Sequence, residues 1–273
     1  MKIKYFIKLI YLSFIGTIRV VLNLLNNSYD RVKPYEKNDL LKIICNGSSL
    51  SECNINTSFQ SQYMVVNFFC LSELFFMLKP QFYVIADPAF YKDDNALNAL
   101  KIINTSTTWK MTIYFINCKN IDNIKKIFDN DMIDIVNLNG TALGGFKKLK
   151  YYFYKKQIAM PSVQNVLVAC LMIGLHMHFK TIELYGVDHS WLRYLTVHDD
   201  NRTYMIDTHF YDEKEVREVE FVPHGYKYHE IIEMFSRMFK SYHEIADYIH
   251  MCKIPTNIIN KSKGSYIDAF KKA

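Results

Sequence analysis

The sequence predicts an α/β fold, with a single Rossmann-like, mostly parallel sheet and helices on both of its faces. Short runs of near-continuous apolar residues alternate with helical patterns, and such runs are typical of strands buried on both faces. Strand–helix alternation indicates parallel strands joined by crossover helices. At 273 residues and 50% hydrophobic content, the chain can bury one full core.

The predicted strands are 41–46, 62–67, 82–87, 111–116, 132–137, 181–186 and a last short one within 254–260. Residues 163–178 are predicted to form a long buried helix that leads into strand 181–186, and 227–250 to form another helix. The segment 187–226 between them lacks a clean period and is rich in His, Asp, Tyr and Arg. A loop of this length inside a compact domain is usually functional, and we expect a lid.

Residues 1–38 are predicted to be a membrane-associating N-terminal amphipathic helix and its linker, ahead of one domain at 39–273. Residues 5–25 are mostly apolar, but Lys8 and Arg19 leave too short an uncharged stretch to cross a bilayer core of about 30 Å. No small-residue cleavage site of a signal peptide follows. The polar positions of this helix fall in one stripe of a helical wheel: Tyr5, Lys8, Arg19, Asn23 and Asn26.

A cationic stripe opposite a wide apolar face favours a helix that lies in the interface of an anionic membrane. A helix packed on the protein itself and a single membrane span are the alternatives. The formal net charge is +6, and the first 29 residues carry four basic residues and no acidic one. The rest of the chain is therefore close to neutral, which argues against a general nucleic-acid binder. The six cysteines show no zinc-site spacing, which favours a reducing, cytoplasmic environment.

Polar residues end three of the predicted strands. The first strand runs into Asn46, Gly47, Ser48 and Ser49; the second ends at Asn67 and the third at Asp87. In a parallel sheet, the carboxyl ends of the strands face one crevice where ligands bind. Gly47 allows close approach of the backbone, and Ser48 and Ser49 suit the start of a helix whose N-terminus favours phosphate.

The run IICNGSSL resembles the first strand and nucleotide-binding turn of the family 42 glycosyltransferases, the bacterial sialyltransferases that use CMP-sialic acid. It also resembles the related domain group of the archaeal-type pterin diphosphokinases. The intervals of 21 and 20 residues between Asn46, Asn67 and Asp87 agree with the family pattern. Ser162 in MPSVQN matches a nucleotide-contacting serine. IELYGVDHS resembles the next motif, which implies nucleotide contacts for Gly186, Asp188 and the adjacent His189.

The resemblance implies a GT-A-like variant of the Rossmann-like fold and metal-independent transfer of a sugar from a nucleotide-activated, CMP-type donor. Tyr204 in YMIDT matches a lid tyrosine that assists departure of the donor phosphate. The acceptor proton needs a base, and a histidine suits that role near neutral pH. By its place in the chain His229 fits best, with His209 and His224 as rivals.

The chain departs from the family pattern at two places. Asp87 stands where sialyltransferases carry Asn, and the second lid tyrosine would fall at Ser190 or Trp191. The resemblance therefore predicts the class of chemistry, with sialic acid or a related sugar as the transferred group. Asp129, Asn130 and Asp131 form a DxD, but they follow a Lys-rich helix and precede a strand. We interpret them as a solvated turn, and we predict no metal site and no cofactor besides the donor.

We expect a glycosyltransferase domain at 39–273 that acts at the cytoplasmic face of the inner membrane. Its acceptor would be a surface glycan of the lipopolysaccharide or capsule type, or a lipid-linked sugar, and its partners would include an anionic membrane surface. Self-association into a homo-oligomer stays open. Two alternatives remain: a diphosphokinase that uses ATP and magnesium, and a non-catalytic membrane-bound assembly factor on a transferase fold.

Overall fold

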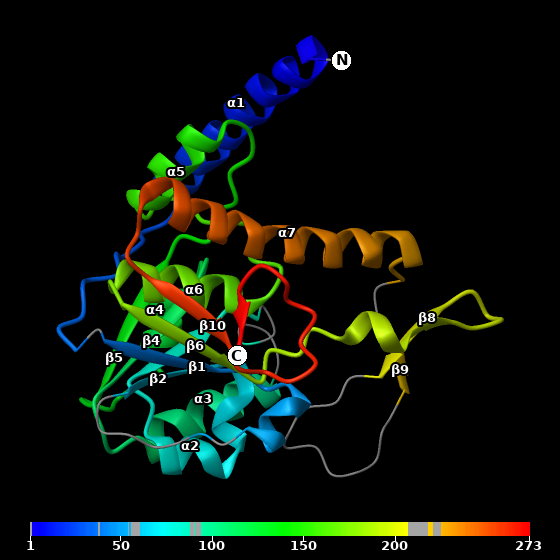
Figure 1. The fold of residues 1–273 in the computed structure, drawn as a ribbon. Coiled ribbons are helices and arrows are strands. Elements are labelled where there is room, and N and C mark those ends of the chain that lie inside the picture. Colours follow the sequence, from blue (N-terminus) through cyan, green and yellow to red (C-terminus); the bar gives the residue numbers. More distant parts are fainter. Residues whose placement is uncertain are drawn as a thin grey trace.

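A computed structural model of the chain describes residues 2–37, 39–53, 55, 61–87, 90, 94–206, 218–220 and 225–273. In this part of the chain the main sheet has eight strands, all parallel, in the order β11-β10-β6-β1-β2-β3-β4-β5 (Figure 1). The strands are β1 (Leu40–Ile44), β2 (Ser61–Val66), β3 (Phe82–Ile85), β4 (Met111–Ile116), β5 (Ile133–Leu138), β6 (Thr181–Tyr185), β10 (Asn257–Asn260) and β11 (Lys271–Lys272).

Each predicted strand is confirmed, with ends that differ by a few residues. The prediction succeeded because the inner strands are buried on both faces and therefore consist mostly of apolar residues. Ile43 and Ile44 are neighbours on β1 and both are fully buried, yet they belong to two different hydrophobic clusters on opposite faces of the sheet. Val65 and Val66 on β2 divide between the faces in the same way.

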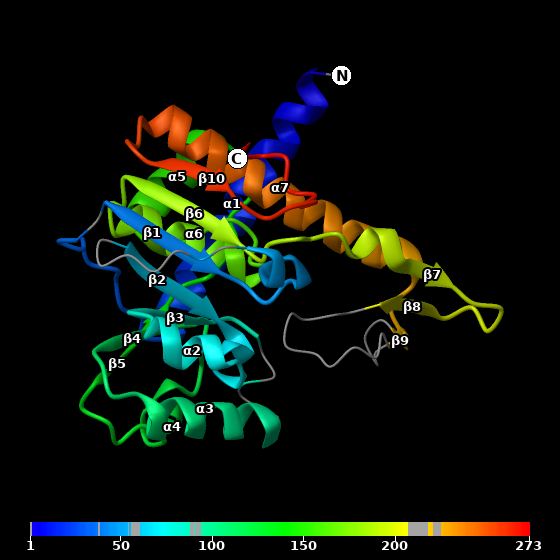
Figure 2. The same ribbon diagram turned by 60° about the horizontal axis from the view of Figure 1, so that its bottom comes forward.

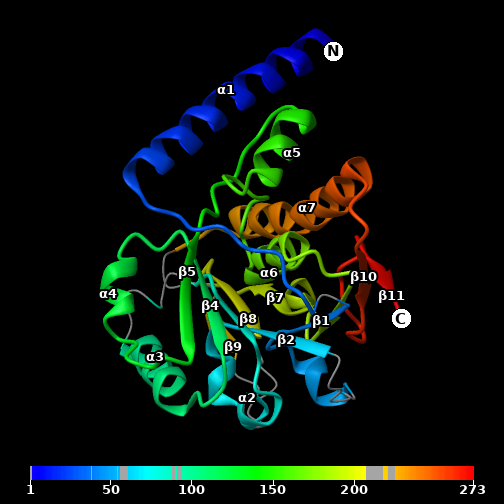
Figure 3. The same cartoon turned by 90° about the vertical axis from the view of Figure 1, so that its left-hand side faces the viewer.

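Helices cover both faces of the sheet, as predicted (Figures 1 and 3). One face carries α5 (Lys147–Lys155), α6 (Val166–His176) and α7 (Tyr228–Cys252), and the other carries α2 (Glu73–Leu78), α3 (Asp94–Ser106) and α4 (Ile121–Lys125). Helix α6 lies between the sheet and α7, and its residues from Val166 to Leu175 are buried. This position explains why its sequence is apolar all round and lacks a polar face.

The strand order changes direction next to β1. From β1 the chain proceeds through β2, β3 and β4 to β5 on one side, and it then returns to add β6, β10 and β11 on the other. The carboxyl ends of β1 and β6 therefore lie at the switch point of the sheet, where the connecting segments leave to opposite sides. In open parallel sheets, this is where a ligand crevice forms.

The segment 187–226, predicted as an irregular lid, has secondary structure of its own. A short 3-10 helix, η4 (Trp191–Tyr194), leads into β7 (Leu195–Val197), which pairs with β8 (Thr203–Ile206). β8 pairs in turn with β9 (Glu218–Glu220), and the three strands form a small antiparallel sheet near the start of α7 (Figure 2).

Helix α1 (Lys2–Asn26) packs its second half against the loop between β5 and α5. Its contact face consists of small side chains, and Val20 is only 1% exposed. Ser13 Oγ accepts a hydrogen bond from Phe146 N at 3.0 Å, and Asn23 Nδ2 donates to Thr141 Oγ1 at 2.5 Å. Asn23 therefore faces the protein, so the predicted polar stripe does not lie on one solvent-facing side.

The outward face of α1 is apolar instead. Large side chains are exposed along its whole length, from Ile3 at 76% and Phe14 at 63% to Leu25 at 76%. The first turns extend away from the body of the protein (Figures 1 and 3). By length and composition, residues Ile3–Asn26 could cross a membrane, so this helix could serve as a membrane anchor or as a signal sequence.

Gly145 controls the docking of α1, which gives a first prediction. Its φ of +95° favours glycine, and a Cβ there would lie 2.6 Å from Ser13 N. Gly145→Ala should therefore loosen α1, and hydrogen exchange of residues 12–23 should rise by about tenfold or more, since the backbone penalty alone is about 1–2 kcal/mol. Gly225→Ala is the control, because Gly225 has a φ of +68° but nothing within 4 Å of the added Cβ. Equal exchange in both variants would contradict this role.

Candidate functional site

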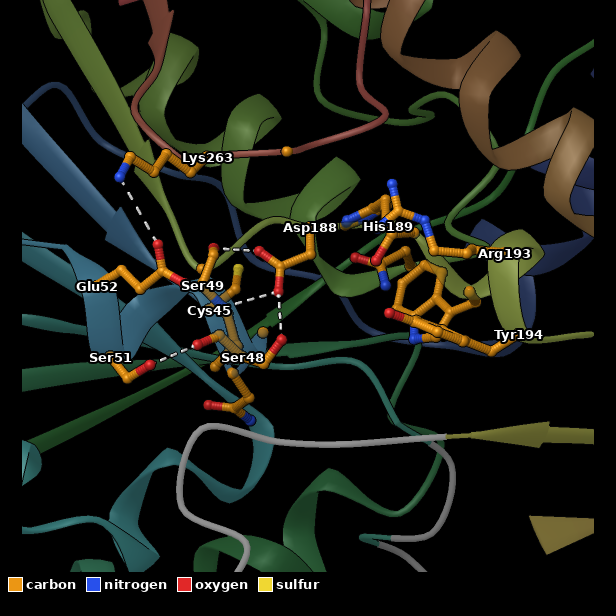
Figure 4. Close-up of a pocket in the computed structure, with 18 of the residues that line it drawn as sticks. Cys45, Ser48, Ser49, Ser51, Glu52, Asp188, His189, Arg193, Tyr194 and Lys263 are labelled. Carbon is orange, nitrogen blue, oxygen red and sulfur yellow. Dashed lines mark hydrogen bonds and ion pairs between the residues drawn. The ribbon is translucent and has the colours of Figure 1, made fainter. Parts of the chain in front are cut away.

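A cavity of about 640 Å³ opens at the carboxyl ends of β1, β2 and β6, at the switch point of the sheet (Figure 4). Most of the residues that the sequence pointed to line this one cavity. They are Asn46, Gly47, Ser48, Ser49, Asn67, Gly186, Asp188 and His189. The fold therefore brings together residues from three strand ends that lie up to 143 positions apart in the chain.

Two glycines let the ends of β1 and β6 touch. Gly47 N donates to Gly186 O at 2.9 Å, and a Cβ on Gly47 would lie 2.5 Å from that oxygen. Gly186 has a φ of +63°, and a Cβ there would run into the carbonyl of Cys45. Neither position accepts a larger residue without a backbone shift. The predicted close approach at Gly47 is therefore present, and its immediate neighbour is another strand end.

The Asp188 carboxylate fixes the turn that follows β1. Its Oδ2 accepts from Ser49 N at 2.9 Å and from Ser48 Oγ at 3.1 Å, and its Oδ1 accepts from Ser49 Oγ (Figure 4). These groups begin the 3-10 helix η1 (Ser48–Glu52). A side-chain anion therefore occupies the place where the sequence analysis expected a phosphate. Ser48 and Ser49 shape the cavity wall, and their hydroxyls are engaged within the protein.

Asn46 and Asn67 present amide groups to the cavity. Among the described residues, no partner donates a hydrogen bond to Asn46 Oδ1, although that atom is buried. A buried amide oxygen in this state has unused capacity to accept a hydrogen bond. Asn67 holds a left-handed conformation with a φ of +44°, and its Oδ1 accepts from Ala86 N at 3.3 Å. Asparagine is among the residues that tolerate this conformation best.

The features that favour an anion lie on the other walls. Asn165 caps the N-terminus of α6 by accepting from Leu167 N at 2.9 Å, and both Asn165 and Val166 line the cavity. The positive end of an 11-residue buried helix therefore meets the cavity. Arg193 and Lys263 add two cations to the lining. Arg193 Nε donates to Tyr266 Oη at 3.2 Å, which holds the guanidinium group in place.

His189 supports the wall of the cavity from within the core. It is 5% exposed, its Nε2 lies 2.7 Å from Tyr242 Oη, and its ring lies 4.7 Å from that of Trp191. Burial lowers the pKa of His189 to about 3. The imidazole is therefore neutral at physiological pH and binds a proton poorly, so His189 positions the cavity and is not suited to be its base.

Other predicted residues lie outside the cavity lining. Asp87 follows β3, which is one strand farther from the switch point than β2. Ser162 lines a second cavity between α1 and α7, and its carbonyl accepts from Ser241 Oγ at 3.0 Å. Tyr204 on β8 stacks on His198 at 4.1 Å and donates to Asp200 Oδ2 at 2.9 Å.

The candidate bases are placed as follows. His229 is exposed in the first turn of α7 and does not line the cavity. His209 and His224 lie outside the described residues. Their assignment as catalytic bases stays a prediction.

The DxD at Asp129–Asp131 forms a turn at the amino edge of the sheet, before β5, whereas the cavity lies at the carboxyl edge. Asn130 Nδ2 donates to the carbonyls of Asn104 and Thr107 at 2.7 and 2.8 Å, and Asp129 Oδ1 accepts from Asn104 Nδ2 at 2.6 Å. These contacts tie α3 to β5. The turn and the cavity therefore lie at opposite edges of the sheet.

Sequence reasoning did not single out several residues that line the cavity: Asn165, Trp191, Arg193, Tyr194 and Lys263. Asn165 had a local signal, since Asn directly before an apolar helix is a favoured N-cap. Arg193 and Tyr194 had none, because nothing in an aperiodic segment shows which residues fold back onto the sheet. Lys263 stands in the closing loop of the motif NIINKSKGSYIDAF, which indicated the segment but not the side chain.

The site thus belongs to a parallel α/β protein with a ligand cavity at the switch point of its sheet. No protein-family model and no curated protein matches the chain. It is similar to an α-2,3-sialyltransferase from Campylobacter jejuni in apo form, with 12% identity over 89% of this chain and 83% of that chain and a TM-score of 0.41. It is also similar to the monofunctional α-2,3-sialyltransferase Cst-I from Campylobacter jejuni, with 14% identity over 88% and 82% and a TM-score of 0.41. The chain thus resembles bacterial sialyltransferases in structure over most of its length, at low sequence identity.

The buried His189 makes stability depend on pH, which gives a second prediction. Its pKa in the folded protein is about 3 against an ordinary 6.5, so below pH 6.5 the unfolded chain binds a proton that the folded chain does not. The free energy of unfolding should therefore fall as the pH falls from 6.5 towards 3. Between pH 5.5 and 4, His189 should contribute about 1.4 kcal/mol per pH unit to this dependence of the free energy of unfolding on pH. His189→Gln should remove that contribution.

Chemical denaturation at several pH values measures this slope. Tyr242→Phe is the control, because it removes the hydrogen-bond partner and leaves the titrating group. It should lower stability by about 1 kcal/mol at every pH and keep the slope. A slope unchanged in His189→Gln would show that His189 is not the group that takes up the proton.

Proposed function

We propose that this protein is a glycosyltransferase that takes its sugar from a nucleotide-activated donor bound in the cavity at the ends of β1, β2 and β6. One observation carries the proposal. Residues with the spacing of a nucleotide-binding turn line a single cavity at the switch point, around the buried and unpartnered Asn46 Oδ1. The motif resemblance to the family 42 glycosyltransferases supports the same assignment.

The cavity walls suggest how the donor lies. Asn46 and Asn67 offer amide groups suited to the hydroxyl and ring-nitrogen pattern of a nucleoside. The N-terminus of α6 and the cations Arg193 and Lys263 favour the phosphate. Transfer leaves a nucleotide phosphate with increasing negative charge, and fixed dipoles and cations stabilise that charge in a sheltered site. These groups can perform the task that a metal ion performs in other transferases.

Tyrosines of the segment after Asp188 complete the proposed leaving-group site. Tyr194 lines the cavity, and the hairpin that carries Tyr204 begins directly after it. Tyr204 pairs across the hairpin with Thr196, two residues beyond Tyr194. We assign Tyr194 the place of the second lid tyrosine, which the sequence comparison put at Ser190 or Trp191, and Tyr204 the first.

The acceptor is proposed to be a glycan or lipid-linked sugar at the cytoplasmic face of the inner membrane. Residues 12–23 of α1 are held by the body of the protein. The exposed cations Lys8 and Arg19 and the outward apolar face of α1 support attachment to the surface of an anionic membrane. All six cysteines are free thiols, as expected of a reducing compartment.

Nucleotide binding is the third prediction. CMP or another nucleoside phosphate should raise the melting temperature of the full chain with and without EDTA. Asn46→Ala and Asn67→Ala should each weaken binding by about 0.5–1.5 kcal/mol, the usual contribution of one hydrogen bond. Asp129→Ala is the control and should bind like the wild type, because that turn lies at the opposite edge of the sheet.

Isothermal titration with CMP, UDP, GDP and ADP compounds measures the affinities. Unchanged affinity in both Asn variants would remove the nucleotide assignment. Binding or turnover that disappears in EDTA and returns with Mg²⁺ would replace the metal-independent mechanism, and a preference for ATP would favour diphosphoryl transfer.

The general base is the subject of the fourth prediction. His229→Ala should lower turnover by about 10²–10⁴-fold and leave donor affinity close to that of the wild type, since a base acts in the transition state. His209→Ala and His224→Ala test the rivals, and Tyr204→Phe should slow the reaction less. His250→Ala is the control, because this histidine is exposed at the far end of α7. Wild-type turnover in all three single variants would make the histidine mechanism wrong.

The apolar face of α1 gives the fifth prediction. Ile10→Asp should strongly reduce sedimentation with anionic vesicles, because Ile10 is 48% exposed on the free part of α1. Met77→Asp is the matched control, since Met77 is 69% exposed on α2, on the other face of the sheet. Alkaline carbonate should release much of the wild type from membranes. Complete retention in both high salt and carbonate would indicate a helix that spans the membrane.

A further inference from the structure

A second cavity, of about 280 Å³, lies where α1 passes α7 and the loop before α5. Three cationic side chains from two helices line it: Arg19 from α1 and Arg237 and Lys240 from α7. Leu12 and Ile15 of α1 form the apolar part of the same lining. Cations and aliphatic side chains thus meet in one concave site beside the apolar face of α1.

The positive charge of this cavity is not neutralised by its one carboxylate. Glu244 forms an ion pair with Lys150 at 2.6 Å, with both side chains mostly buried, and it also accepts from Tyr154 Oη. Its carboxylate is therefore paired with a fourth cation, Lys150, and with the hydroxyl of Tyr154. Arg237 has an exposed contact of 3.4 Å with Glu233, one turn earlier on α7. Within the described part of the chain, no carboxylate pairs with Arg19 or Lys240.

We propose that this cavity binds the phosphate of a membrane lipid headgroup, with the acyl chains along the outward apolar face of α1. Guanidinium groups bind phosphate oxygens with two parallel hydrogen bonds, and the lysine adds a third contact. Ile15, one turn before Arg19, and Ile18, directly before it, are 37% and 39% exposed. They offer the hydrocarbon surface that a lipid needs and that a free phosphate ion does not.

The cavity is joined to the donor cavity by adjacent residues of α7. Ser241 Oγ donates to the carbonyl of Ser162, which lines the lipid cavity. The next residue, Tyr242, contacts His189 in the wall of the donor cavity. In the segment before α6, Ser162 lines the lipid cavity, and Asn165, three residues farther along the chain, lines the donor cavity. A lipid held here would place the membrane surface next to the transfer site, and this last point rests on the proposed function.

The test uses the full chain in neutral detergent and short-chain phosphatidic acid as the probe, with binding measured by titration calorimetry. The Arg237→Gln/Lys240→Gln double variant should bind this lipid at least tenfold more weakly than the wild type. Lys8→Gln on α1 and Lys148→Gln on α5 are the controls, since both cations are exposed outside the cavity. Both should stay within about twofold of the wild type.

Three outcomes would overturn the proposal: no saturable binding by the wild type, an equal loss in the control variants, or equal affinity for inorganic phosphate. The last would show a site for free phosphate. The corresponding short-chain diacylglycerol, which lacks the phosphate, should not bind. Nucleotide affinity measured on the same double variant should be unchanged. A protein that binds the lipid but no nucleotide would contradict the proposed transferase and leave the lipid site standing.

Discussion

The direct contact between the ends of β1 and β6 organises the candidate site. Gly47 and Gly186 approach so closely that their backbones share a hydrogen bond of 2.9 Å, and neither has room for a side chain. Two residues beyond Gly186, the Asp188 carboxylate reaches back to Ser48 and Ser49. A backbone hydrogen bond and the hydrogen bonds of the Asp188 carboxylate therefore hold the ends of β1 and β6 together at the switch point of the sheet. The residues of this contact line the cavity, so the shape of the cavity depends on the contact.

The C-terminal segment stabilises the backbone next to the Asp188 carboxylate. Ser262 Oγ accepts from Val187 N at 2.9 Å, and Ser265 Oγ donates to Val187 O at 2.6 Å. Tyr266 N donates to Asp188 O at 2.9 Å. The loop that follows β10 thus fixes the backbone that carries Asp188 and His189. Since the two serine hydrogen bonds are buried, a substitution in this loop should also disturb the cavity wall.

The distribution of charge and apolar surface is the basis for the proposed contact with a membrane. The outward side of α1 exposes large apolar residues. Its inward side carries smaller side chains, which allow it to pack closely on the loop before α5. Helix α7 runs from this region, where Arg237 and Lys240 lie, past the donor cavity, where Tyr242 contacts His189. A single helix therefore borders both cavities. This arrangement would suit the proposed transferase with an acceptor at a membrane surface.

The sequence by itself determined the class of fold and most of the cavity. Runs such as 62–67 predicted strands because burial on both faces favours apolar side chains, and Asn46 and Asn67 marked where two of them end. It did not determine which strands are neighbours. Asp87 ends a strand like the others but lies one strand farther out, and Ser162 lines the second cavity, between α1 and α7. Arg193 and Lys263 reach the site only through the fold. Strand order and loop placement depend on contacts between distant segments, and local residue patterns carry no information about them.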